Sequence, residues 1–255
     1  MCELLGMSAN VPTDICFSFT GLMQRGGRTG PHVDGWGIAF YEGRGYRVFR
    51  DRMPSSQSQV ADLIRSYSIR SHVVICHVRQ ANRGGVCLEN THPFSRELWG
   101  RYWTFAHNGQ LKGFRKLKCE TYRPVGTTDS ERAFCWLLDR IRERFPKPPR
   151  RRETLWRFIE DVGTRLGEYG VFNFLLSDSR HLYARCSNHL SWITRRAPFG
   201  VAHLKDTELV VDFAEETTPN DVVTVVATRP LTENERWNIL SPGDFVVFDG
   251  GERLA

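Results

Sequence analysis

Hydrophobic and polar positions follow two different periods along the chain, and their order predicts the fold class. Short apolar runs rich in β-branched residues are typical of buried strands, whereas apolar residues three and four apart are typical of amphipathic helices. The runs that predict strands are 2–8, 35–41, 46–50, 72–79, 102–107, 171–177, 181–186, 190–194, 208–213, 222–227 and 244–249. The segments that predict helices are a short one opening at 12–14, then 56–67, 128–145 and 154–168.

Two long helices follow each other with no strand between them, and strands precede and follow the pair. This order excludes a regular alternation of strands and helices around a parallel sheet. It predicts an α+β protein in which helices pack on the outer faces of antiparallel sheets. The residues at 80–98 show neither period, and we expect a long irregular segment there, of the kind that is often functional.

Composition narrows the class of protein. The chain has 255 residues, of which 40% are hydrophobic, so it can bury a sizeable core. No apolar run reaches the ~20 residues of a membrane helix, and the first residues lack the pattern of a signal peptide. Seven cysteines without a Cys-x-x-Cys pair argue against a disulfide scaffold. We therefore expect a cytoplasmic protein that does not associate with membranes.

Much of the net charge of +6 lies in the basic, proline-rich tract at about 146–152. A nucleic-acid surface is one interpretation of such a tract. However, no aromatic residue interleaves with these arginines as a stacking platform requires. The sequence favours a solvated linker over a nucleic-acid partner.

Cys2 is the first residue that could carry chemistry, because it follows Met1 directly. A cysteine is small enough for the methionine before it to be removed, which would place a free α-amine beside the thiol. The amine titrates near pH ~8 and can take the thiol proton, and the thiolate is the reactive form. The alternative is an inert cysteine at the start of a buried strand.

Three further positions each have a structural and a functional interpretation. Asn108-Gly109 is a strong hairpin-turn signal, but an Asn amide and a Gly N–H can also form an oxyanion hole. Arg79 can be a solvated strand end, or it can grip a carboxylate with its fork. Asp129 lies in a capping box that starts a helix, and its carboxylate could also contact an ammonium group.

We expect neither a metal site nor a cofactor. On a strand, His72 and Cys76 would share one face while His77 points to the other, and no second set of ligands follows. The glycines at 26, 27 and 30 lack the strand and the Lys-Ser/Thr of a phosphate loop.

Taken together and in order, these motifs resemble the class II (N-terminal nucleophile) glutamine amidotransferases, in particular their small stand-alone, YafJ-like type. The resemblance covers roughly residues 2–135. The matching motifs are Cys2 after Met1, Gly35-Trp36-Gly37, His77-Val78-Arg79, Thr91-His92-Pro93, His107-Asn108-Gly109 and Thr128-Asp129-Ser130-Glu131. The resemblance implies a single domain over 2–255, folded as a four-layer αββα sandwich of two antiparallel sheets between helical layers.

The resemblance also implies the roles of these residues. Cys2 would be the nucleophile that attacks the γ-carboxamide of glutamine, with its own α-amine as the base. Asn108 and Gly109 would hold the oxyanion. Arg79 would bind the α-carboxylate of the substrate, and Asp129 its α-ammonium. His92 and His107 would support the site. The segment Asn82-Arg83-Gly84-Gly85 departs from the pattern of synthase-linked members, and so does Gln80.

Three functions are therefore open at this point. The chain could hydrolyse glutamine or a γ-glutamyl amide by itself. It could be a glutaminase subunit that delivers ammonia to a separate synthase partner, or a non-catalytic binding protein on the same fold. The sequence indicates neither the leaving amine nor the oligomeric state.

Overall fold

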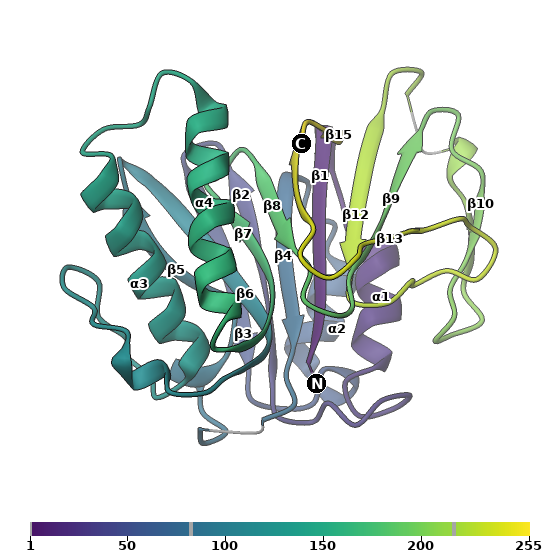
Figure 1. Cartoon of the computed structure of the whole chain (residues 1–255). Coiled ribbons are helices and arrows are strands. Elements are labelled where there is room, and N and C mark those ends of the chain that lie inside the picture. The colour runs from purple at the N-terminus through teal and green to yellow at the C-terminus, as the bar shows by residue number, and fades with distance from the viewer. Residues whose placement is uncertain (1, 82–83, 216–217) are drawn as a thin grey trace.

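The computed structural model describes residues 2–81, 84–215 and 218–255, which form two antiparallel sheets between two helical layers (Figure 1). The first sheet contains β1 (Glu3–Thr13), β2 (Trp36–Glu42), β3 (Gly45–Asp51), β4 (Ser71–Val78), β9 (Ser191–Arg196), β12 (Val222–Ala227) and β13 (Asn238–Ile239). The second contains β5 (Phe94–Leu98), β6 (Arg101–Leu111), β7 (Gly170–Ser177), β8 (Leu182–Arg185), β14 (Phe245–Asp249) and β15 (Glu252–Arg253). The helices are α1 (Cys16–Gln24), α2 (Gln59–Ser66), α3 (Asp129–Arg144) and α4 (Arg152–Gly167).

The strand order is β13-β9-β12-β1-β4-β2-β3 in the first sheet and β15-β14-β8-β7-β6-β5 in the second. β1 and β6 each lie inside a sheet, between two antiparallel neighbours. β10 (Val201–His203) and β11 (Val210–Asp212) form a separate two-stranded ribbon.

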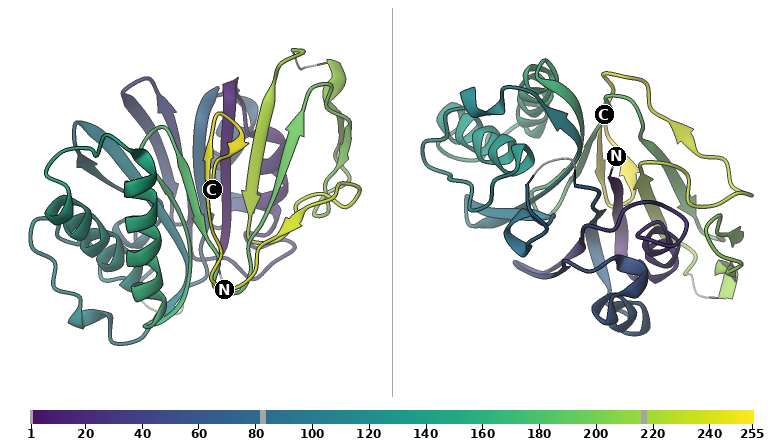
Figure 2. Two further views of the ribbon diagram at one scale, coloured as in Figure 1. Left: turned by 45° about the horizontal axis from the view of Figure 1, so that its top comes forward. Right: turned by 90° about the horizontal axis from the view of Figure 1, so that it is seen from below.

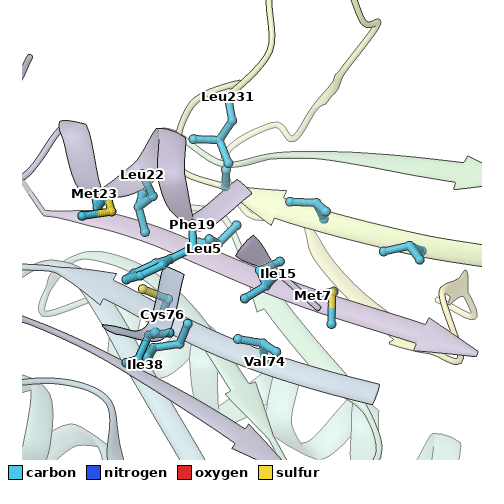
Figure 3. Packing of buried hydrophobic residues seen from close by; sticks show 14 of the residues in the cluster. Leu5, Met7, Ile15, Phe19, Leu22, Met23, Ile38, Val74, Cys76 and Leu231 are labelled. Carbon is cyan, nitrogen blue, oxygen red and sulfur yellow. The ribbon is translucent and has the colours of Figure 1, made fainter. Parts of the chain in front are cut away.

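A separate hydrophobic core fills each boundary between layers. α1 and α2 cover the outer face of the first sheet, where Phe19 and Leu22 of α1 pack near Leu5 of β1 (Figure 3). α3 and α4 cover the outer face of the second sheet. Leu4 of β1 belongs to the third core, between the sheets. Neighbours along a strand point to opposite faces, so β1 is buried on both sides, and the predicted αββα sandwich is confirmed.

The structure differs from the predicted elements where local sequence and long-range pairing disagree. The helix expected from 12–14 begins only at Cys16, because β1 continues to Thr13 after an irregularity in its pairing with β4. The irregular segment expected at 80–98 ends in the strand β5. Of the two interpretations of Asn108-Gly109, the hairpin turn is wrong, because β6 continues through both residues to Leu111 in register with β7.

The two ends of the sandwich carry different features. The start of β1 lies at the bottom of Figure 1, and the connection between α3 and α4, with the exposed arginines of the basic tract, lies at the top. Seen from below, the N-terminus is near the middle of the molecule, with α3 and α4 on one side and α1 and α2 on the other (Figure 2). Among the described residues, no helix is long and apolar enough to cross a membrane.

Candidate active site

Cys2 immediately precedes β1, opposite the end of β4. The pairing of Glu3 with Val78 sets Cys2 across from Arg79, on the face of the sheet that looks toward the second sheet. The half-buried thiol donates to the Gln80 carbonyl and accepts from the Gln80 N–H, both at 3.4 Å. Burial raises the pKa of the Cys2 thiol, and the Gln80 N–H and the Arg79 charge oppose that shift. Because a protonated thiol is a weak nucleophile, any attack by this thiol on a substrate would need a base.

The second sheet contributes Asn108, whose buried side chain meets the first sheet at Thr228. Asn108 Nδ2 donates to Thr228 Oγ1 at 3.3 Å, and the same oxygen accepts the Leu4 N–H at 2.9 Å. Asn173 Nδ2 donates to the Asn108 carbonyl at 2.9 Å. Thr228 therefore joins the first residues of β1 to the Asn108 amide across the sandwich.

Gly109 is explained by close packing rather than by a turn. A Cβ atom at this position would lie 1.9 Å from the Val171 carbonyl oxygen on β7. Phe172 of β7 is the pairing partner of Gly109. Its N–H points away from β6 and donates to Ser187 Oγ at 3.0 Å. The Gly109–Phe172 pair is thus a non-hydrogen-bonded one, and the Gly109 N–H points to the opposite edge of β6. Because the pairing of β5 with β6 stops at Phe105, this edge lies beyond the end of β5.

Arg79 is buried and holds the loop that follows β4. Its guanidinium donates to the backbone carbonyls of Gly85 at 3.1 Å, Gly84 at 3.3 Å and Asp34 at 3.4 Å. The arginine is therefore not a solvated strand end. Asn82 and Arg83 of the divergent segment lie outside the described residues.

Asp129 is the first residue of α3, and its carboxylate reaches back to β6. Asp129 Oδ2 accepts the Leu111 N–H at 2.7 Å. The N-cap is Thr128, whose hydroxyl accepts the Glu131 N–H at 3.2 Å. Glu131 does not complete the capping box, because its carboxylate pairs with Arg96 at 2.6 Å and accepts backbone N–H groups before α3. The negative charge of Asp129 is close enough to Cys2 to raise the pKa of the thiol.

The two histidines expected to support the site lie on different sides of the second sheet. His92 stacks on His77 with ring centroids 4.1 Å apart. His107 faces α3, with its ring nitrogens 2.8 Å from Ser130 Oγ and 3.1 Å from the Val171 carbonyl. Burial lowers the pKa of His77 to about 3 and that of His92 well below its usual value. Both stacked rings are therefore neutral at physiological pH.

The glycine-rich motif at 35–37 makes room for this stack. A Cβ atom on Gly37 would lie 2.3 Å from the His92 carbonyl oxygen. The backbone before β5 therefore passes directly over β2, and only glycine permits that approach.

Sequence reasoning missed Thr228 and Asn173. Asn173 could have been noticed as a polar residue inside the apolar run 171–177, where a buried amide needs partners. Thr228 follows β12 and carries no local signal of its own. Among the described residues, no group of three or more His, Cys, Asp or Glu side chains is arranged to hold a metal ion.

The chain is similar along its whole length to known proteins. The family described as "Glutamine amidotransferases class-II" matches residues 1–255. The protein YafJ of Escherichia coli (strain K12), provisionally named a glutamine amidotransferase, is 60% identical over 254 residues and is covered completely, as is this chain. A Haemophilus influenzae protein with a similar provisional name is 47% identical over 255 residues, which cover 100% of this chain and 86% of that protein.

Solved structures extend the comparison to the fold. A Pseudomonas aeruginosa structure, also provisionally named a glutamine amidotransferase, has 57% identity, a TM-score of 0.81 and complete coverage of both chains. The glutamine phosphoribosylpyrophosphate amidotransferase of Bacillus subtilis has a TM-score of 0.65 at 15% identity, with 99% of this chain and 48% of that one covered. At that identity the likeness concerns the fold alone.

Proposed function

This chain belongs to the class II glutamine amidotransferases, and we propose that it hydrolyses the γ-carboxamide of glutamine, or of a γ-glutamyl amide, through a thioester on Cys2. One observation carries the proposal. The register of β1 and β4 sets Cys2 across from Arg79, and the charges of Arg79 and Asp129 act on the pKa of its thiol in opposite directions. A thiol flanked by one cation and one anion suits a substrate with a zwitterionic head and a reactive carbonyl.

The head of the substrate would be held by these two charges. The planar fork of Arg79 can bind an α-carboxylate with two parallel hydrogen bonds. To do so it would exchange contacts that it now makes with the carbonyls of Gly84 and Gly85. Substrate binding would thereby be coupled to the position of the loop after β4. Asp129 would accept hydrogen bonds from the α-ammonium group.

The reaction would begin after removal of Met1. The free α-amine of Cys2 takes the thiol proton, and the thiolate attacks the γ-carbonyl carbon. Asn108 Nδ2 and the Gly109 N–H stabilise the oxyanion, and each donor is worth about 3 kcal/mol in the transition state. The protonated amine then gives its proton to the departing nitrogen. Water attacks the thioester that remains, which releases glutamate and restores the thiol.

Glutamate release from glutamine and from a panel of γ-glutamyl amides tests the proposal. We expect turnover by the purified protein, and none by a folded Cys2→Ala variant, since the thioester cannot form. Near-normal turnover by Cys2→Ala would contradict the mechanism. Negligible turnover by the native protein that cell extract restores would favour a glutaminase subunit with a separate synthase partner.

A further inference from the structure

Asn90 is a buried side chain between the loop after β4 and the start of α3. It ends a short 3-10 helix, Leu88–Asn90, and is 2% exposed. Two residues later, His92 stacks on His77 of β4 with ring centroids 4.1 Å apart. The backbone that carries Asn90 is therefore held against the first sheet.

The Asn90 amide donates to the loop that Arg79 holds. Asn90 Nδ2 donates to the Gly85 carbonyl at 3.2 Å, and Arg79 donates to the same oxygen at 3.1 Å. Gly84 lies over the amide, since a Cβ atom there would be 3.1 Å from Asn90 Nδ2. When Arg79 turns to a substrate carboxylate, the Gly85 carbonyl therefore keeps a donor, and the loop loses less by releasing the arginine.

The same amide is bonded to the segment that leads into α3. Asn90 Oδ1 accepts the Thr127 N–H at 2.8 Å, and Asn90 Nδ2 donates to Thr127 Oγ1 at 3.3 Å. A Cβ atom on Gly126 would lie 2.4 Å from Asn90 Oδ1, so this backbone passes directly over the amide. Thr127 lies two residues before Asp129. One side chain therefore joins the loop held by Arg79 to the turn that carries Asp129.

We propose that Asn90 is a positioning residue, which fixes Arg79 and Asp129 relative to each other so that both charges of an α-amino acid head are matched at once. This inference rests on the proposed function and identifies what selects the head of its substrate. Binding groups act together only when their spacing is held. Loss of the link should therefore weaken a substrate that uses both charges more than one that uses a single charge.

Kinetics with two substrates test this role. We would compare kcat and KM for glutamine and for glutaramate, which has no α-amine. The variants are Asn90→Ala, which removes the whole link, and the milder Thr127→Val, which removes the Thr127 hydroxyl that the amide contacts.

Asn10→Ala is the matched control. The Asn10 amide also bridges two backbone groups, since it donates to the Asn220 carbonyl at 2.7 Å and accepts the Val222 N–H at 2.8 Å. Along β1, Asn10 is separated from Cys2 by roughly 25 Å of extended chain. This variant should leave KM unchanged for both substrates.

We expect Asn90→Ala to raise KM for glutamine about tenfold and for glutaramate less than about threefold, with kcat within about twofold, because the reacting groups are untouched. Thr127→Val should act in the same direction, by about threefold. In an Asp129→Asn background, Asn90→Ala should cost glutamine less than about twofold, because only one charge remains to be placed. An equal rise of KM for both substrates, the same rise in Asn10→Ala, or an undiminished penalty in the Asp129→Asn background would overturn the role.

Binding to Cys2→Ala protein, measured by calorimetry, separates this inference from the proposed function. Glutamine binding that Asn90→Ala weakens more than glutaramate binding, in an enzyme that turns over neither substrate, would support the positioning role and contradict the hydrolysis. Turnover of both substrates that Asn90→Ala affects equally would support the hydrolysis and reject the role. Cys2→Ala protein that binds no glutamine would overturn both.

Discussion

The Asp129 carboxylate accepts the backbone N–H of Leu111 at 2.7 Å, which joins the first turn of α3 to the end of β6. Leu111 lies two residues after Gly109 on the same strand. A residue proposed to bind the substrate head is thus fixed relative to a residue proposed to hold the oxyanion. Within the described residues no hydrogen bond to the second carboxylate oxygen occurs, and under the proposed function this oxygen would contact the ammonium group.

Replacing Asp129 by Asn should weaken the use of substrates with a free α-amine. The neutral amide keeps the size of the side chain but loses the charge, and we expect kcat/KM for glutamine to fall about 30-fold, or about 2 kcal/mol. Glutaramate, which keeps the carboxamide and one carboxylate but lacks the amine, is the matched substrate. An equal loss with glutaramate would indicate that Asp129 acts only by holding the end of β6 through Leu111.

Gly109→Ala should lower both stability and activity. The added methyl group would lie 1.9 Å from the Val171 carbonyl, so β6 and β7 would have to separate, at about 3 kcal/mol. Gly45→Ala is the control, because its Cβ would be 3.7 Å from the nearest atom, the Glu42 carbonyl oxygen. Urea denaturation should show a large loss for the first variant and almost none for the second. Comparable stability of the two variants would contradict the close contact.

Thr228→Val should impair turnover although Thr228 would not contact the substrate. The substitution removes the oxygen that accepts from Leu4 N–H and Asn108 Nδ2, and an unpaired buried N–H costs about 1–3 kcal/mol. We expect kcat to fall at least tenfold while KM changes little, because the Asn108 donor is misplaced. Thr228→Ser keeps the hydroxyl and should restore most of the rate. Failure of Ser to do so would argue that the methyl group, rather than the hydrogen bonds, matters.

Much of this architecture follows from short-range patterns. The apolar periods at 128–145 and 154–168 became α3 and α4 with small shifts at their ends. β5 was missed because its mixed sequence, Phe-Ser-Arg-Glu-Leu, shows no clear alternation; it forms as one arm of a hairpin with β6, joined through Trp99 and Gly100. Asn108-Gly109 favours a turn locally, but pairing with β7 keeps both residues in a strand. A local sequence pattern does not indicate this pairing.

The candidate site was predictable to the extent that its residues belong to motifs. Arg79 and Asn108 come from different sheets, yet family resemblance assigned both to one site. Thr228 could not be found in this way, since its partners Leu4 and Asn108 are 224 and 120 residues away. The hydrogen bonds that Thr228 accepts exist only because the fold brings these distant residues together.

Stability should decrease as the solution becomes acidic, with His77 as one source. Its pKa is lowered by burial from 6.5 to about 3, so the folded protein keeps His77 neutral while the unfolded chain takes up a proton. Above pH 6.5 His77 is neutral in both states, so it does not lower the free energy of unfolding. As the pH falls from 6.5 toward 3, protonation of the unfolded chain lowers the free energy of unfolding by up to about 1.4 kcal/mol per pH unit.

The free energy of unfolding, measured between pH 7.5 and 5 for native protein and for His77→Leu, tests this expectation. Below pH 6.5, the slope of the free energy of unfolding against pH should be smaller in the variant, by an amount that corresponds to about one bound proton. Exposed His189 provides the control, and His189→Gln should leave the slope unchanged. An unchanged slope in His77→Leu would mean that His77 takes up its proton equally in the folded and unfolded states, and would contradict a lowered pKa.

The central claim, that Cys2 is a processed nucleophile in a glutamyl-shaped site, is tested most directly by intact-protein mass before and after exposure to a γ-electrophilic glutamine analogue. We predict a mass without Met1 and a single adduct, located on Cys2 by peptide mapping and absent from Cys2→Ala. Protein that lacks Met1 but forms no adduct, or forms it on another half-buried thiol such as Cys16 or Cys87, would contradict the account.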